Sequence, residues 1–160
     1  MFFFFNNEKM TALTLAKYIL TRAKAQGRHV TNLKLQKILY YVQGYYLAKF
    51  DHPLFPDEIQ AWKFGPVVPN VYYEFSIFGP DNLTISHEER IDNCEQDEIQ
   101  LIDSVIEDKM RYSPSELVKA THSEAPWRKA TNNGNITRPN TVIDTNDMKE
   151  YFKEVMRTEQ

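Results

Sequence analysis

The stretch Thr31-Asn-Leu-Lys-Leu-Gln-Lys-Ile-Leu-Tyr-Tyr-Val-Gln-Gly-Tyr-Tyr46 decides the fold that this sequence predicts. Its apolar residues recur at the 3.6-residue period of a helix that buries one face: Leu35, Ile38, Leu39, Val42 and Tyr46. Thr31 is a good helix cap, so a helix is predicted from Asn32 to about Phe50. Gly44 costs about 1 kcal/mol relative to alanine inside a helix. We therefore expect another backbone to come close to the helix there.

More helices are predicted on both sides of this stretch. Thr11 can cap a first helix that ends at Gly27, and the two helices should form an antiparallel hairpin. A Ser-Pro-Ser-Glu capping box starts at residue 113. Together with apolar periodicity, it predicts helices near 69–78, 99–110, 113–121 and 145–156, and a short helical turn at 125–130. Ile59 to Phe64 alternates like a short strand, which can pair with Leu83 to Ile85.

These elements predict a mainly α fold: a compact single-domain helical fold of about five to six helices, with room for a short two-stranded β element. The length of 160 residues suits one domain with a real core. We expect residues 1–9 to be either disordered or an extension, without function, and residues 10–157 to form the domain.

The composition excludes several classes of protein. A single cysteine, Cys94, cannot form an internal disulfide and suits the reducing cytoplasm. No apolar run reaches the roughly 18 residues of a membrane helix, so we expect no membrane partner. The sequence lacks a Cys-x-x-Cys pair, a phosphate-binding loop and a dinucleotide-binding turn. We therefore expect no metal and no cofactor.

The net charge of −3 conceals a strong separation of charge along the chain. Residues 9–49 carry eight Lys or Arg and no Asp or Glu, whereas residues 86–109 carry nine acidic residues against two basic ones. The two segments can face and neutralise each other inside the fold. The alternative is an uncompensated basic face, which would make the chain a nucleic-acid-binding regulatory protein.

Two groups of residues are candidates for contact with a partner, and the first lies on the predicted central helix. Lys34, Lys37, Tyr41 and Tyr45 form a row beside its buried face, at helical spacing. Tyrosines suit an interface because they combine a large contact area with a polar tip. The same tyrosines can also simply cover the core.

The second group lies on Ala61-Trp-Lys-Phe-Gly-Pro-Val-Val-Pro69, which we call the elbow. Pro66 keeps Gly65 out of the helical region, and the final proline suits the first turn of a helix, so the elbow should be rigid. A rigid loop loses little entropy when it binds a partner. The elbow would display Trp62, Lys63 and Phe64. Alternatively, the tryptophan plugs a structural corner.

The remaining polar residues do not predict a catalytic site. Cys94 lies among carboxylates, which suppress its thiolate. The four histidines have no metal-ligand spacing. His122 with Glu124 is the pair that would serve a small enzyme, and it would need a cleft that holds both side chains. We expect no catalytic residues and no metal site.

Together these stretches resemble the SocA-like antitoxin domain, also called Panacea, which is familiar from phage-associated GepA-type proteins. Three ordered motifs carry the resemblance: Asn32 to Tyr41, Ala61 to Tyr72 and Leu117 to Trp127. The similarity runs from about Met10 to Phe152. It implies an antitoxin that neutralises a cognate protein toxin, encoded by the adjacent gene, by direct contact. In the adaptor form of this role, the antitoxin delivers the toxin to the ClpXP protease.

The resemblance implies a protein-binding module and not an enzyme. The residues predicted to contact the partner are Lys34, Lys37, Tyr41, Tyr45, Trp62, Lys63, Phe64, Gly65, Pro66, Tyr72, His122 and Trp127. In the third motif, we expect His122 to cap a helix and Trp127 to plug the core.

Overall fold

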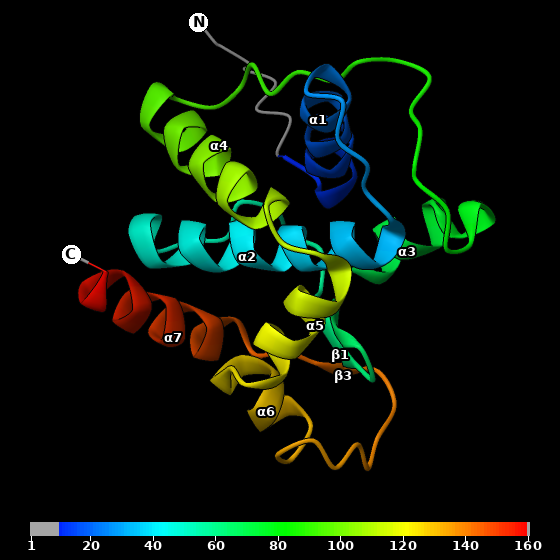
Figure 1. The fold of residues 1–160 in the computed structure, drawn as a ribbon. Helices are drawn as coiled ribbons and strands as arrows, with labels where there is room; N and C mark the ends of the chain where they lie inside the picture. The colour runs from blue at the N-terminus through cyan, green and yellow to red at the C-terminus, as the bar shows by residue number, and fades with distance from the viewer. Residues whose placement is uncertain (1–9, 160) are drawn as a thin grey trace, which may run out of the picture.

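The computed structural model describes residues 10–159, and the extension predicted at 1–9 lies outside them. Within these residues, seven α-helices and one 3₁₀ turn are joined by loops and three short strands (Figure 1). The helices are α1 Ala12–Ala25, α2 Asn32–Phe50, α3 Pro69–Glu74, α4 Gln96–Met110, α5 Pro114–His122, α6 Ala125–Ala130 and α7 Thr145–Thr158. The strands are β1 Gln60–Trp62, β2 Gly65–Val67 and β3 Thr141–Val142, and the 3₁₀ turn is η1 Ser76–Phe78. The mainly α fold class is confirmed.

The structure has more helices than the expected five to six, because two very short segments, α3 and α6, also form α-helices. α3 and α6 have six residues each, and both carry a proline in the first turn. Proline has no amide hydrogen to lose there, and its fixed φ angle already suits a helix. The local sequence therefore starts a helix even where it continues for little more than one turn.

Three helices, α1, α2 and α5, start at the side chains that the sequence indicated. Thr11 and Thr31 each accept a hydrogen bond from the amide three residues further along. Ser113 and Glu116 form the reciprocal capping box, with distances of 3.1 Å and 2.9 Å. A cap of this kind contributes about 1 kcal/mol to helix stability. Local chemistry therefore fixes where α1, α2 and α5 begin.

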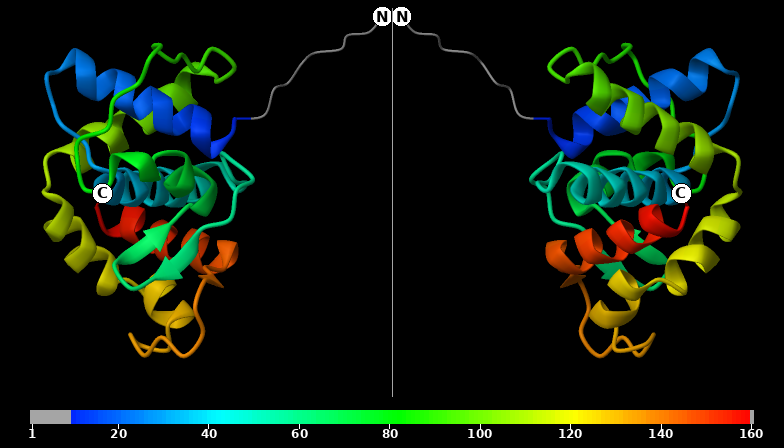
Figure 2. Two further views of the ribbon diagram at one scale, coloured as in Figure 1. Left: turned by 90° about the vertical axis from the view of Figure 1, so that its right-hand side faces the viewer. Right: turned by 90° about the vertical axis from the view of Figure 1, so that its left-hand side faces the viewer.

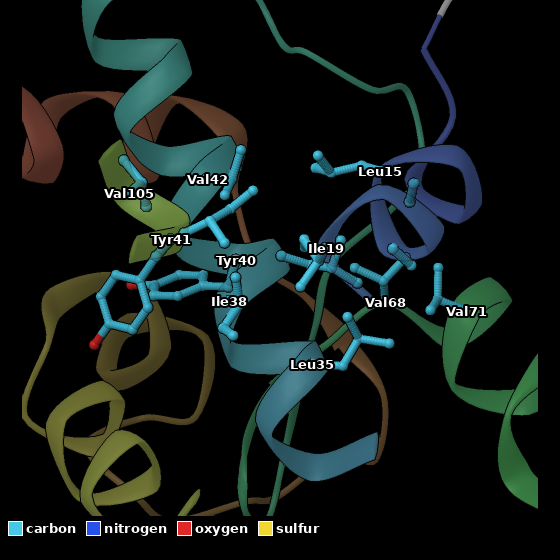
Figure 3. Packing of buried hydrophobic residues seen from close by; sticks show 14 of the residues in the cluster. Leu15, Ile19, Leu35, Ile38, Tyr40, Tyr41, Val42, Val68, Val71 and Val105 are labelled. Carbon is cyan, nitrogen blue, oxygen red and sulfur yellow. The ribbon is translucent and has the colours of Figure 1, made fainter. Parts of the chain in front are cut away.

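α2 runs through the centre of the molecule, with α1 and α4 on one side and α5 and α7 on the other (Figure 1, Figure 2). Its residues are buried almost all the way around, although the sequence pattern predicted one buried face. A helix surrounded by other elements has little solvent face left. In the close-up, Leu35 of α2 lies near Ile19 of α1 and Val68 at the start of α3 (Figure 3).

The small sheet has three strands and not the expected two. β1 lies in the middle, antiparallel to both β2 and β3. Gly65 explains the pairing with β2, because its φ of +111° lets the chain turn back directly after Phe64. Such a hairpin closes a much shorter loop than a pairing with a distant segment.

The predicted second strand at 83–85 was wrong. The amide of Leu83 donates instead to the carbonyl of Val30 at 2.8 Å, and Asn82 forms a single bridge with Thr31. This segment is therefore attached to the connection between α1 and α2, away from β1.

Gly44 lies under a side chain and not under another backbone. A Cβ atom placed there would lie 2.1 Å from Cε2 of Phe152 in α7. The close approach predicted for this glycine is present, but the expected partner was wrong. A backbone is not needed, because the flat ring of Phe152 itself fills the space above the helix.

Part of the charge separation is neutralised inside the fold. Arg22 of α1 pairs with Asp103 at 3.2 Å and with Glu107 at 2.8 Å, both on α4. Lys34 and Lys37 are buried and therefore contribute little to an exposed basic face. The arrangement favours internal neutralisation over a continuous cationic surface.

Candidate functional site

The elbow is supported from inside by a buried lysine. Lys37 of α2 is fully buried, and its Nζ donates a hydrogen bond of 2.8 Å to the carbonyl of Pro66. Loss of hydration lowers the pKa of Lys37 to about 7. Lys37 thus acts beneath the elbow, and its own side chain is not available to a partner in this conformation.

Gly65 has no room for a side chain at this place. A Cβ atom would lie 2.6 Å from Cε of Lys37 and 2.8 Å from Oγ1 of Thr121. The elbow therefore approaches both α2 and α5 more closely than any other residue type would allow. Like Lys37, Gly65 and Pro66 are buried, and they determine the shape of the elbow.

Two further carbonyls of the elbow are held by side chains from α5 and α6. His122 lies with its Nε2 3.0 Å from the carbonyl oxygen of Lys63, and Nε1 of Trp127 donates to the carbonyl of Trp62 at 2.9 Å. Since a carbonyl only accepts, this contact requires a hydrogen on Nε2 of His122. The two rings stack, with centroids 4.1 Å apart. Burial lowers the pKa of His122, which favours its neutral form.

The elbow turns several side chains outward while its backbone is held. Phe64 is 57% exposed, Lys63 is exposed and Trp62 is half-buried. The ring centroid of Trp62 lies 5.0 Å from that of Tyr72 and 6.1 Å from that of Tyr73. We call these five residues the elbow face: Trp62, Lys63, Phe64, Tyr72 and Tyr73.

A groove of about 480 Å³ adjoins the elbow face. Leu33, Val67 and the aromatic residues Trp62, Phe64 and Tyr72 contribute to its walls. Large exposed hydrophobic side chains also gather in this part of the chain, since Tyr73 is 63% and Ile77 89% exposed. An aromatic, concave surface of this kind is typical of a site that binds another protein.

Tyr73 and Ile77 were missing from the residues predicted to contact a partner. Their signal was present in the sequence, because the two residues lie four positions apart on the segment predicted as helical at 69–78. Val71 and Phe75 mark the buried side of that segment. The sequence showed the periodicity, but not which side the rest of the fold would cover.

The row predicted along α2 lies largely inside the molecule. Lys34, Lys37 and Tyr41 are buried, and Tyr45 is half-buried. The Nζ atom of Lys34 donates to the carbonyl of Met110 at 2.7 Å. The buried residues cannot touch a partner in this conformation, and they act by packing α2 into the core. This agrees with the alternative that the tyrosines cover the core.

A buried carboxylate connects α2 to the start of α6. Tyr40 donates to Oε1 of Glu124 at 2.9 Å, and Tyr41 donates to Oε2 at 2.7 Å. Burial raises the pKa of Glu124, although the two hydrogen bonds act in the opposite direction. Lys109 lies 4.3 Å from the ring centroid of Tyr41. This cluster fixes α6, and with it Trp127, against the central helix.

Replacing Glu124 by alanine is expected to lower the free energy of unfolding by about 2–4 kcal/mol, because two buried hydroxyl groups lose their acceptor. Glu124→Gln should cost less than half as much, since the amide accepts one hydrogen bond and can donate another. Urea unfolding of both variants at pH 7 measures the difference. Equal losses would contradict the role assigned to these hydrogen bonds.

The hypothetical catalytic pair does not share a cleft. His122 faces the carbonyl of Lys63, while Glu124 is buried against the tyrosines of α2. In the part of the chain that the structure describes, no three or more His, Cys, Asp and Glu side chains gather where they could hold a metal ion. Over residues 10–159, no helix has the length and apolar character needed to span a membrane.

Comparison with known proteins places this arrangement in a family. The family model described as Antitoxin SocA-like, Panacea domain matches residues 35–128. The chain belongs to the SocA-like Panacea family. Antitoxin SocA from Caulobacter vibrioides (strain NA1000 / CB15N) is 35% identical over 131 residues, which cover 75% of this chain and 70% of that relative. No solved structure matches the chain.

The Panacea match includes the elbow together with the residues that hold it. Lys37, Gly65, Thr121, His122 and Trp127 all lie between residues 35 and 128. α1 and α7 lie outside the matched range. The matched range of this Panacea domain thus includes the elbow and its supports together with most of α2 and all of α3, α4 and α5, while α1 and α7 pack against α2 from outside that range.

Proposed function

We propose that this chain is an antitoxin, and that it neutralises a cognate protein toxin in the cytoplasm by binding the toxin against the elbow face. Membership of the SocA-like Panacea family supports the antitoxin role. One observation carries the choice of surface: the elbow exposes aromatic side chains while three of its carbonyls accept hydrogen bonds from inside the fold. We expect the toxin to be the product of the adjacent gene.

A loop held in this way is well suited to binding. Because its backbone is already fixed, it loses little conformational entropy when a partner binds. Aromatic residues at the centre of an interface often cost about 2 kcal/mol or more of binding free energy when they are truncated. The groove beside the elbow provides a concave surface on which such contacts can exclude water.

Co-expression with the product of the adjacent gene should give a complex that copurifies, and it should relieve the toxicity of that product. Phe64→Ala combined with Tyr73→Ala is expected to weaken the complex roughly 100-fold, or about 3 kcal/mol. Both side chains are more than half exposed, so the fold should be retained. Calorimetric titration measures the affinity, and thermal unfolding checks the fold.

Ile136→Ala is the matched control for these substitutions. Ile136 is also exposed, but it lies in the loop after α6 and outside the elbow face. This variant should bind the toxin normally. Absence of both a complex and relief of toxicity would refute the antitoxin role. A complex that is unaffected by the elbow substitutions would refute only the surface assigned to it.

Neutralisation by contact and delivery to ClpXP predict different fates for the toxin. Delivery needs a surface that contacts the protease in addition to the one that contacts the toxin. We favour neutralisation because contact at the elbow face is sufficient for it. Toxin levels can be followed after protein synthesis is stopped, in cells with and without ClpXP. We expect a stable, inactive toxin in both. A toxin that disappears only when both ClpXP and this chain are present would establish the adaptor role.

Nucleic-acid binding has less structural support. Arg22 is paired with carboxylates of α4, and Lys34 and Lys37 are buried. Strong binding to a phosphate backbone requires several exposed cations along one surface. We therefore expect no complex with DNA or RNA that weakens steeply as salt is added, and such a complex would favour this alternative.

A further inference from the structure

A second hollow lies where the C-terminal end of α1 meets the segment 83–85. Its volume is about 260 Å³. Apolar side chains line it, among them Leu20, Val30 and Leu83. Three basic side chains stand around it: Lys24, Arg28 and His29. We call it the α1 hollow.

Backbone hydrogen bonds fix both walls of the α1 hollow. The amide of Leu83 donates to the carbonyl of Val30 at 2.8 Å. At the end of α1, the amide of Arg28 donates to the carbonyl of Ala23 at 2.9 Å, around Gly27 with its φ of +65°. Neither bond depends on a side chain, so both backbone segments are held in place.

The basic groups around the hollow are not tied to neighbouring side chains. Lys24, Arg28 and His29 are exposed, and their side chains make no hydrogen bond or ion pair with another described residue. Glu107 interacts with Arg28 through its charge, but it already accepts a hydrogen bond of 2.8 Å from Arg22. Because the whole chain carries a net charge of −3, a local excess of positive charge is not a general property of it.

Stabilisation of α1 explains only part of this charge. A cation in the last turn of a helix interacts favourably with the carbonyl groups at its end, and Lys24 lies in that turn. Arg28 and His29 lie beyond the helix end, beside an apolar hollow, so stabilisation of the helix does not account for them.

We propose that the α1 hollow binds a partner polypeptide through one apolar side chain flanked by carboxylates. The apolar lining takes the side chain, and the basic groups pair with the carboxylates. The volume is below the roughly 300–1,000 Å³ of pockets for small molecules, so it suits a single side chain. A phosphate backbone by itself would pair with the basic groups but has no apolar group to place against Leu20 and Leu83. The α1 hollow and the elbow face share no residue, so this site is independent of the proposed function.

Binding of a labelled peptide to the full chain tests the proposal. The probe is a fluorescein-labelled peptide with a central leucine and two aspartates on each side, followed by fluorescence polarisation. One control peptide has alanine in place of leucine, and the other has asparagines in place of the aspartates. Each control should bind about tenfold more weakly or worse, because each lacks one of the two kinds of contact.

Two substitutions locate the binding site on the protein. Arg28→Glu should weaken binding of the leucine peptide about tenfold. Lys49→Glu makes the same change in net charge at an exposed position in the last turn of α2, whereas the hollow lies near the start of that helix. This control should bind the leucine peptide with unchanged affinity. Thr84 is an exposed residue of the hollow, so Thr84→Trp should block it without disturbing the core. This variant should lose the preference for leucine over alanine.

Several results would overturn the proposal: no binding of the leucine peptide, equal binding of the three peptides, or equal effects of Arg28→Glu and Lys49→Glu. Tighter binding of a twelve-nucleotide single-stranded DNA would also overturn it, in favour of a nucleic acid. The elbow variant Phe64→Ala should bind the leucine peptide normally. Failure at the α1 hollow can thus be distinguished from failure of the proposed toxin contact.

Discussion

Gly44→Ala is expected to lower the free energy of unfolding by roughly 3 kcal/mol, although alanine is the better helix former by about 1 kcal/mol. The added carbon would lie 2.1 Å from Cε2 and 2.2 Å from Cδ2 of Phe152. The ring has no free space to move into, because Tyr40, Tyr41 and Tyr45 surround it. α7 must therefore shift away from α2, and the contact between the two helices is weakened.

A second substitution, Phe152→Ala, separates the two effects of Gly44→Ala: the clash with the ring and the gain in helix propensity. By itself, this substitution is expected to cost about 3–5 kcal/mol, because it leaves a cavity in the core. In its presence, Gly44→Ala should be neutral or stabilising by up to about 1 kcal/mol. Urea unfolding of the four proteins, followed by circular dichroism, gives the coupling energy. If Gly44→Ala costs as much without the ring as with it, contact with Phe152 is not the cause.

The second large effect is a rise in stability with pH that depends on Lys37. Its pKa is about 7 in the folded chain, against 10.5 for an ordinary lysine. Between these values the unfolded chain binds more protons than the folded one, so the free energy of unfolding rises with pH, by up to about 1.4 kcal/mol per unit. This contribution is complete above pH 10.5, falls steadily as the pH is lowered from 10.5 towards 7, and is absent below about 7.

Lys37→Met isolates the effect, because it removes the titrating group and keeps a long apolar side chain. Between pH 7.5 and 9, the stability of the unsubstituted protein should rise by about 2 kcal/mol relative to that of Lys37→Met. Lys49→Met, at an exposed position of the same helix, should show no such change. Urea unfolding at several pH values measures all three proteins. Parallel pH profiles for the unsubstituted protein and Lys37→Met would contradict the depressed pKa.

The helices were predictable because their signals are local. Thr11, Thr31 and the pair Ser113 and Glu116 form caps within three residues of sequence, and the hydrogen bonds of the structure confirm them. The sheet was less predictable, because its pairing depends on the positive φ of Gly65. The Gly-Pro pair indicated a turn, but not that the segments before and after it would pair as the strands β1 and β2.

The candidate site was predictable as a segment and less so residue by residue. Periodicity shows which side chains share a face of a helix, but not how many neighbours surround that helix. The burial of Lys37 was therefore missed, and for Tyr41 the choice between partner contact and core stayed open. The bonds from Tyr40 and Tyr41 to Glu124 join residues more than 80 positions apart. Such contacts depend on the packing of α2 against α5 and α6, which no local pattern contains.

The hydrogen bonds that hold the elbow have a consequence for how this surface can evolve. They end on the carbonyl groups of Trp62, Lys63 and Pro66, and every amino acid has such a group. Exchanging the exposed side chains at positions 63 and 64 therefore removes none of these bonds. Substitutions at these positions can therefore change the chemistry of the exposed surface without a matching loss of stability.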